Sequence, residues 1–390
     1  MNMPKGFQFS AVEAAIKKPG RKDLALIWSE VPATAAAVFT TNAVKAAPVV
    51  LSQERIVGGR CQALVVNSGN ANACTGAQGM ADARETTRIL AQELGIAEEL
   101  IQVCSTGVIG QPLPMERLTA ALPPLAAGRG SATLDDLAGA IMTTDTFPKT
   151  AMRQGAGYAI AGIAKGAGMI MPNMATMLSF VMTDAAVEPA FLAACFRGAV
   201  ERSFNAVTVD GDTSTNDTCL IMANGAAGTP AIAAGTPQAA EFTRLLEEVL
   251  LDLAKLIVKD GEGATKFVEI RVSGAVSDAD AKRAALAVAN SCLVKTAFYG
   301  QDANWGRIFA AVGYSGAQVN PDRLALWFDD VQMAKDGVFA GGDAEERGSA
   351  VLRGKEFCVS VDLGVGTGSA TVFTCDLSHD YVSINADYRT

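Results

Sequence analysis

Residues 165–180 read KGAGMIMPNMATMLSF, and this stretch passes from a glycine-rich loop into the start of a strand. A Pro-Asn pair at 172–173 indicates a turn, and the run from Thr176 to Asp184 (TMLSFVMTD) has the apolar content of a buried strand. A threonine at such a junction has two interpretations. It opens the strand, because threonine is a good β-former, or its hydroxyl is a nucleophile. The rest of the chain has to decide between them.

Composition indicates a well-buried globular protein. The 390 residues are 49% apolar and 19% charged, which suits a large core with a smaller companion domain. No apolar run approaches the ~20 residues of a membrane span, and the first residues lack the apolar segment of a secretory signal. The net charge of −9 argues against nucleic-acid binding. We therefore expect a cytoplasmic protein that binds neither membrane nor nucleic acid.

Histidine and cysteine chemistry is poorly supported. The single histidine, His379, has polar neighbours, and we expect it to be solvated in a loop. An acyl-transfer enzyme with this sequence would then need another base. No C-x-x-C pair suggests a zinc site, so we expect no metal and interpret the thiols as core residues of a reducing compartment. The cysteines are at positions 61, 74, 104, 195, 219, 292, 358 and 375.

Strand-like and helix-like segments alternate along the chain, which predicts a mixed α/β protein. Gly95 is the expected stop of one helix, and Ser131 or Thr133 the expected cap of another. We expect a main domain over 1–280 and a smaller one over 281–390. The predicted helices cover 78–95, 133–145, 188–204, 237–261 and 278–292. The predicted strands cover 61–67, 100–110, 158–166, 176–184 and 266–275, with a glycine-turned hairpin over 356–377.

Three clusters of hydroxyl side chains lie in polar segments: Ser105-Thr106-Gly107, residues 143–146 (TTDT) and residues 208–218 (TVDGDTSTNDT). Hydroxyl groups, and backbone N–H groups beside glycine, can donate to an oxyanion. Each cluster is equally explained by turns and helix caps. Alone, none of them identifies a site.

A threonine nucleophile can work without histidine if the preceding peptide bond is cut. Cleavage between Ala175 and Thr176 would free an α-amine, whose usual pKa of about 7.7–8 lets it act as a base near neutral pH. Ala175 is small and would leave its carbonyl open to the Thr176 hydroxyl. An N→O acyl shift followed by hydrolysis would then make Thr176 a new N-terminus.

The stretch KGAGMIMPNMATML resembles the nucleophile motif of the ornithine acetyltransferase family, the glutamate N-acetyltransferases of arginine biosynthesis. The similarity runs over nearly the whole chain, in motifs that occur in the same order. The other motifs are VVNSGNANACTG, CSTGVIG, IMTTDTFPK, TVDGDTSTNDT, KDGEGATKFVEI, KTAFYGQDANWGRI and YVSINADYRT.

The resemblance implies a role for several residues. Thr176 is the implied nucleophile, and the Ala175–Thr176 bond is the implied self-cleavage site. Thr106 and Gly107 are the implied oxyanion-stabilising pair. The implied substrate-contacting residues are Thr143, Lys165, Thr176, Glu262, Asn385 and Thr390.

Two of these residues carry charges that suit the substrates. Because both substrates are charged amino acids, we interpret Lys165 as the partner of a substrate carboxylate and Glu262 as the partner of an ammonium. Without the resemblance, Lys165 would be interpreted as a solvated loop charge and Glu262 as a helix-end residue.

The implied fold is a layered αββα sandwich like that of the related self-processing aminopeptidases. A smaller C-terminal α/β domain follows, and its last strand would return to the site. The fragments 1–175 and 176–390 would stay together and assemble as α2β2. The implied reaction is ping-pong transfer of acetyl from N-acetylornithine to glutamate, with no metal or organic cofactor. Acetyl-CoA stays open as a second donor.

Two other classes of function stay open. An N-terminal-nucleophile aminopeptidase or amidase would use the same threonine but pass the acyl group to water. It would release free acetate without glutamate. A ligand-binding protein would need no cut and would show no burst of ornithine release.

Overall fold

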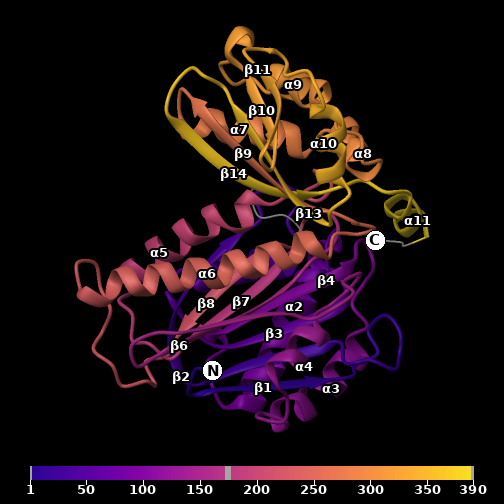
Figure 1. Cartoon of the computed structure of the whole chain (residues 1–390). Helices are drawn as coiled ribbons and strands as arrows, with labels where there is room; N and C mark the ends of the chain where they lie inside the picture. Colours follow the sequence, from indigo (N-terminus) through magenta and orange to yellow (C-terminus); the bar gives the residue numbers. More distant parts are fainter. Residues whose placement is uncertain (1, 172–176, 388–390) are drawn as a thin grey trace. The chain divides into compact units, whose positions relative to one another are not determined.

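The computed structural model describes residues 2–171 and 177–387, which form two compact units (Figure 1). Among the described residues, the first unit contains those of 1–205 together with 212–257, and the second contains 206–211 and 258–387. The second unit therefore begins upstream of residue 280, where the sequence places the boundary. In the described residues, no helix combines the length and apolar character needed to cross a membrane.

The first unit is built around one mixed sheet. Its strands are β1 (Phe7–Val12), β2 (Leu24–Phe39), β3 (Arg60–Asn70), β4 (Ile101–Val108), β5 (Lys149–Gln154), β6 (Ala159–Lys165), β7 (Leu178–Thr183) and β8 (Thr218–Ala223). Its helices are α1 (Ala47–Ile56), α2 (Gly76–Leu94), α3 (Met115–Ala127), α4 (Leu134–Ala140), α5 (Pro189–Arg202) and α6 (Pro237–Lys259), of which α6 ends inside the second unit.

The long strand β2 joins two halves of this sheet. The strand order is β4-β3-β2-β8-β7-β6-β5, with β1 also paired to β2. The segment Leu24–Trp28 pairs with β1 and β3, whereas Thr34–Phe39 pairs with β8. The ladder with β3 is interrupted between Trp28 and Ala33. Irregularities of this kind bend a strand, so β2 can belong to both halves.

The inner faces of the two halves pack against each other. Ile27 and Leu64 of one half share a buried cluster with Phe180 and Leu220 of the other. Because successive side chains of a strand point to opposite faces, the neighbouring Val65 belongs instead to a cluster with residues of α2 and α3. One half of the sheet is thus covered by helices on its outer face.

The other half is covered by α5 and α6, which lie across β7 and β8 in Figure 1. The contact between α6 and β6 is close at Gly162, where a Cβ atom would be only 2.9 Å from Leu253 Cδ1. The layers are therefore helix, sheet, sheet and helix. The α/β layered sandwich expected from the sequence is confirmed.

Local sequence explains where two of the helices begin or end. The side chain of Thr133 accepts a hydrogen bond from Asp136 N at the start of α4, and the Asp136 carboxylate bonds back to Thr133 N. Gly95 ends α2 with a φ of +66°, as expected. The helix predicted over 133–145 is shorter, because the chain leaves the helix after Ala140 and turns.

The second unit is a smaller α/β body with a six-stranded sheet in its described residues. Its strands are β9 (Phe267–Ala275), β10 (Ala325–Phe328), β11 (Val331–Lys335), β12 (Val338–Phe339), β13 (Glu356–Asp362) and β14 (Gly368–Cys375). Its helices are α7 (Asp278–Ala289), α8 (Cys292–Tyr299), α9 (Trp305–Tyr314), α10 (Ala344–Leu352) and α11 (His379–Asp387).

Two predictions about this unit are wrong. The strands β13 and β14 do not form a hairpin, because β9 lies between them, parallel to β13 and antiparallel to β14. The last segment is the helix α11 and not a strand. His379 is exposed as expected, but it begins this helix, and its ring lies edge-on to Tyr299 with 5.7 Å between centroids.

Candidate functional site

Thr106 and Lys165 meet at one edge of the sandwich. Thr106 lies near the end of β4, Lys165 ends β6, and Lys165 Nζ is 3.1 Å from Thr106 Oγ1. In the sheet register Lys165 pairs with Leu178 of β7, and Leu178 pairs with Thr218 of β8. The end of β6 and the starts of β7 and β8 therefore lie side by side near the end of β4.

Lys165 is a core residue and not a solvated loop charge. It is 2% exposed, and Thr106 is 4% exposed. An ammonium group can only donate hydrogen bonds, so the Thr106 oxygen accepts and its own hydrogen points elsewhere. Among the described residues, Thr106 Oγ1 has no acceptor for that hydrogen. The hydroxyl is thus suited to donate to a substrate oxygen.

Only glycine fits at position 107. Gly107 has a φ of +133°, a region that side chains disfavour. A Cβ atom there would be 2.3 Å from the carbonyl carbon of Gly69 and 2.5 Å from the nitrogen of Asn70, both in the neighbouring strand β3. The missing side chain lets β3 and β4 approach each other beside Thr106.

Asp145 connects several segments around this edge. Its carboxylate accepts from Thr143 N at 3.0 Å, from Gly166 N at 2.7 Å and from Lys149 Nζ at 2.7 Å. The side chains of Asp145 and Lys149 are fully buried. The predicted site residue Thr143 is thereby tied to the residue that follows Lys165.

Neighbouring ammonium groups and hydrogen bonds stabilise the negative charge of Asp145. Burial alone would raise the pKa of this carboxyl, but the ammonium groups of Lys165 and Lys149 and its hydrogen bonds outweigh that effect and lower the pKa to about 2. Asp145 is therefore ionised at neutral pH. The ammonium groups of Lys165 and Lys149 both stabilise this one buried carboxylate.

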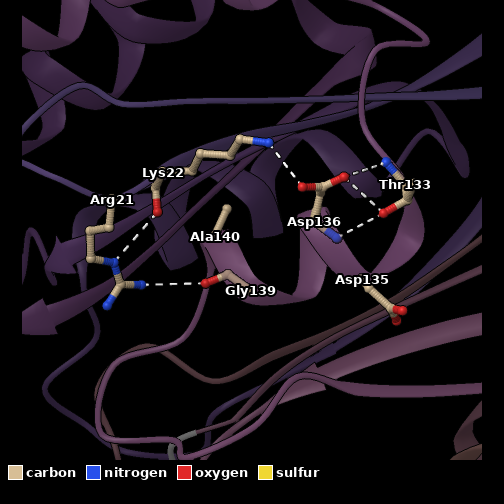
Figure 2. A pocket seen from close by; sticks show the side chains of 7 residues that line it. All are labelled: Arg21, Lys22, Thr133, Asp135, Asp136, Gly139 and Ala140. Carbon is tan, nitrogen blue, oxygen red and sulfur yellow. Dashed lines mark hydrogen bonds and ion pairs between the residues drawn. The ribbon is translucent and has the colours of Figure 1, made fainter.

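A surface pocket lies beside the turn that contains Thr143 (Figure 2). Its volume is about 410 Å³, and Arg21, Lys22 and the helix α4 line it. The guanidinium of Arg21 donates to Met142 O at 2.7 Å, directly before Thr143, and Lys22 pairs with Asp136 at 2.9 Å. Through these bonds, Arg21 stabilises the turn before Thr143, and Lys22 stabilises the start of α4.

Asp217 is the second buried carboxyl in this region. It precedes β8, is fully buried, and accepts from Met177 N through Oδ1 at 2.9 Å. Within the described chain, its Oδ2 has no hydrogen-bond partner. Burial raises the pKa of Asp217 well above its usual range, against the opposing effects of Met177 N–H and the Lys165 ammonium.

In the second unit, the structure brings Glu262 and Asn385 together. The Asn385 side chain, on α11, donates from Nδ2 to Glu262 Oε2 at 2.8 Å. The Glu262 turn is also fixed at Gly263, whose carbonyl accepts from Ser378 Oγ at 2.6 Å. Further along, Asp376 accepts from the backbone of Thr265 at 2.8 Å. Glu262 is therefore held by residues just before and within α11.

The remaining predicted residues, Ala175, Thr176 and Thr390, lie outside the described residues. In residues 2–171 and 177–387, no three side chains of the usual metal-ligating types gather as a metal site would require.

Sequence reasoning missed Asp145, Lys149 and Asp217 as parts of the site. Each lies inside one of the family motifs, IMTTDTFPK or TVDGDTSTNDT, beside the hydroxyl residues that the sequence singles out. The available signal was an acidic residue at or just before an apolar strand, as in NDTCLIM. A charge in that position has to be paired or neutralised when it is buried.

Comparison with known proteins places the chain in a family. Residues 8–390 match the ArgJ family. The chain belongs to the ArgJ family. The arginine biosynthesis bifunctional protein ArgJ of Geobacter sulfurreducens is 72% identical over 390 residues, which cover 99% of each chain. The protein of the same description from Syntrophotalea carbinolica is 56% identical over 388 residues, again 99% of each chain.

A solved structure supports the fold. The crystal structure of arginine biosynthesis bifunctional protein ArgJ from Bacillus halodurans has a TM-score of 0.53 and 43% sequence identity, and it covers 55% of this chain and 100% of that one. The family expected from the motifs is therefore confirmed, and with it the expectation of an acyltransferase in arginine biosynthesis. Membership of the ArgJ family does not favour the aminopeptidase alternative.

Proposed function

We propose that this ArgJ-family chain transfers acetyl from N2-acetyl-L-ornithine to L-glutamate, with Thr176 as nucleophile. The observation that carries this proposal is the 3.1 Å contact of Lys165 with Thr106. It places an ammonium and a threonine hydroxyl at the edge where β7 begins, two residues after Thr176. The description of the relatives as arginine biosynthesis bifunctional proteins supports it.

The nucleophile forms by self-cleavage. The Thr176 hydroxyl attacks the carbonyl carbon of Ala175, and the C–N bond of that peptide breaks as an ester forms. Water then hydrolyses the ester, which returns the hydroxyl and leaves a carboxyl group on Ala175. The products are fragments 1–175 and 176–390, and the free α-amine of Thr176 is the base for the next reaction.

The acetyl transfer has two halves. The Thr176 amine takes the hydroxyl proton, the oxygen attacks the acetyl carbonyl, and the C–N bond to ornithine breaks as ornithine takes up a proton. An acetyl ester of Thr176 remains. The amine of glutamate attacks this ester and leaves as N-acetylglutamate, and Thr176 regains its proton. Neither half uses a metal or an organic cofactor.

Each half passes through a tetrahedral oxyanion. Thr106 and Gly107 are the proposed donors to it, from the hydroxyl and from the backbone N–H. We assign Lys165 to the substrate carboxylate and Glu262 to a substrate ammonium, with Thr143, Asn385 and Thr390 as further contacts. The cleaved fragments form a cytoplasmic α2β2 assembly. The relatives' description as bifunctional proteins supports acetyl-CoA as a second acetyl donor.

Intact masses of the untagged protein under denaturing conditions test the proposal. The wild type should give two fragments, the larger beginning at Thr176, and Thr176→Ala should give one uncut chain. Acetyl-transfer assays with and without acetyl-CoA then identify the donor. Activity in an uncut wild type would rule out the Thr176 amine as the base. Release of free acetate without transfer to glutamate would favour a hydrolase.

A further inference from the structure

Asn216 and Asp217 connect two strands that the proposed mechanism uses for different tasks. The Asn216 side chain donates from Nδ2 to Ser105 O at 2.8 Å and to Ala71 O at 2.6 Å. Ser105 directly precedes Thr106. The next residue, Asp217, accepts from Met177 N at 2.9 Å, and Met177 directly follows Thr176. Two consecutive side chains thus bind next to the proposed oxyanion donor and next to the proposed nucleophile.

Both side chains are rigidly held. Asn216 is 6% exposed, and its Oδ1 accepts from the Thr215 hydroxyl at 2.6 Å, so both ends of its amide are bonded. Asp217 is fully buried, and its backbone carbonyl accepts from the N–H of Thr40, the residue after β2, at 3.0 Å. Burial and these hydrogen bonds restrict the conformations of both residues.

Two hydrogen bonds hold the backbone of Met177. Met177 O accepts from Thr218 N at 3.2 Å, as the parallel pairing of β7 and β8 requires. The Met177 N–H donates to the Asp217 side chain, and the backbone carbonyl of Asp217 accepts from Thr40 N. Both backbone groups of Met177 are therefore fixed by residues 217 and 218.

We propose that Asn216 and Asp217 are positioning residues, a clamp that fixes the Thr176 nucleophile relative to the Thr106 oxyanion donor. This inference rests on the proposed function of Thr176 and Thr106. The clamp acts through two backbone groups. Met177 N belongs to the residue after Thr176, and Ser105 O belongs to the residue before Thr106. A carboxyl is not required for this role, because an amide oxygen can accept the same hydrogen bond.

The test compares variants that keep or remove these hydrogen bonds. Asp217→Asn keeps an acceptor for Met177 N, whereas Asp217→Leu removes it. Asn216→Leu removes the donors to Ala71 O and to Ser105 O. The control is Thr183→Val at the far end of β7, where a buried hydroxyl bonds to Ala159 O at 2.7 Å. Each variant is followed by the time course of self-cleavage, by kcat and KM of the cleaved enzyme, and by thermal unfolding.

Misplacement of reacting groups by about 1 Å costs on the order of 100-fold in rate, so we expect both leucine variants to cleave at least about 10-fold more slowly. Their kcat should fall while KM stays near the wild-type value. Asp217→Asn should stay within about threefold of the wild type, and Thr183→Val should lose stability without slower cleavage. If the leucine variants are insoluble, Asp217→Ala and Asn216→Ala remove the same hydrogen bonds.

Two results would overturn the clamp. Variants without the hydrogen bonds that cleave as fast as the wild type would exclude positioning. A loss in Asp217→Asn as large as in Asp217→Leu would show that the carboxyl itself reacts or carries charge, because the acceptor is retained. A wild type that does not cleave at residue 176 would instead contradict the proposed function.

Discussion

Lys165 Nζ lies 3.1 Å from Thr106 Oγ1, and both residues are buried. Since the ammonium occupies a lone pair of the hydroxyl oxygen, the Thr106 hydrogen is left for another acceptor. Lys165 therefore has a second proposed role besides binding the substrate carboxylate. It orients the hydroxyl of Thr106, the proposed oxyanion donor.

Thr106→Val should lower kcat by about 10²- to 10³-fold, the usual effect of losing one oxyanion donor, with a much smaller change in KM. Thr106→Ser keeps the hydroxyl and should retain most of the activity. Steady-state acetyl transfer from N-acetylornithine to glutamate measures both. A valine variant within threefold of the wild type would show that Thr106 is not such a donor.

The effects of Lys165 and Thr106 should not be additive. Lys165→Met removes the group that orients the Thr106 hydroxyl, so part of its cost should vanish in a Thr106→Val background. A double-mutant cycle on kcat measures this coupling, which we expect to be at least about threefold because the two groups are in direct contact. Additive effects would mean that Lys165 acts on the substrate alone.

Asp145→Asn should destabilise the fold strongly. The change leaves the fully buried ammonium of Lys149 without its carboxylate, and removing one partner of a buried ion pair typically costs about 3–5 kcal/mol. Chemical denaturation measures the loss, and adding Lys149→Met should recover part of it. The control is Glu54→Gln, in a pair with Arg84 whose side chains are about half exposed, where we expect less than about 1 kcal/mol.

The same carboxyl predicts how stability depends on pH. Asp145 has a pKa of about 2 in the folded state against a usual value of 3.8, so the unfolded chain takes up its proton first as the pH falls. Its contribution of about 2 kcal/mol is therefore present above pH 4 and is lost between about pH 4 and pH 2.

Denaturation curves of the wild type and Asp145→Asn at several pH values test this sign. The stability difference between them should be largest near neutral pH and should shrink as the pH falls below about 4. A difference that stays constant down to pH 3 would mean that the Asp145 charge does not contribute.

The sequence predicts local features of this chain well. The cap at Thr133 and the stop at Gly95 depend on neighbouring residues only, and both were found where expected. Burial of Lys165 could not be predicted, because an isolated lysine is usually exposed, and here it depends on Thr106, 59 residues away. The sequence motif identifies Lys165 as a site residue, and only the tertiary structure identifies Thr106 as its partner.

Pairing between distant strands was also beyond the sequence. Alternation correctly predicted strands at both ends of 356–377, but it does not specify a strand's partner, and β9 inserts between them. Similarly, YVSIN alternates like a strand and yet forms part of α11. The buried pair of Asp145 and Lys149 is four residues apart outside any helix, so no helical period reveals it.

The hydrogen bond from Asn385 to Glu262 leads to a prediction about substrate binding. If Glu262 holds a substrate ammonium, Asn385→Ala should raise KM by about three- to tenfold with little change in kcat, since a partly exposed hydrogen bond to a charged group orients that carboxylate in ground and transition states alike. Glu262→Gln should raise KM further. The control is Ser383→Ala on the same helix, whose hydroxyl donates within α11, to His379 O at 3.3 Å.

Michaelis constants for N-acetylornithine and for glutamate, measured separately, decide where Glu262 acts. A change confined to one substrate would assign Glu262 to that half of the reaction, and equal increases would mean that both amino acids place a positive group there. Negligible effects on both constants in Glu262→Gln would exclude the ammonium contact. The Asn385 bond would then only attach α11 to the turn, and Asn385→Ala should lower the thermal unfolding temperature of the second unit without changing kinetics.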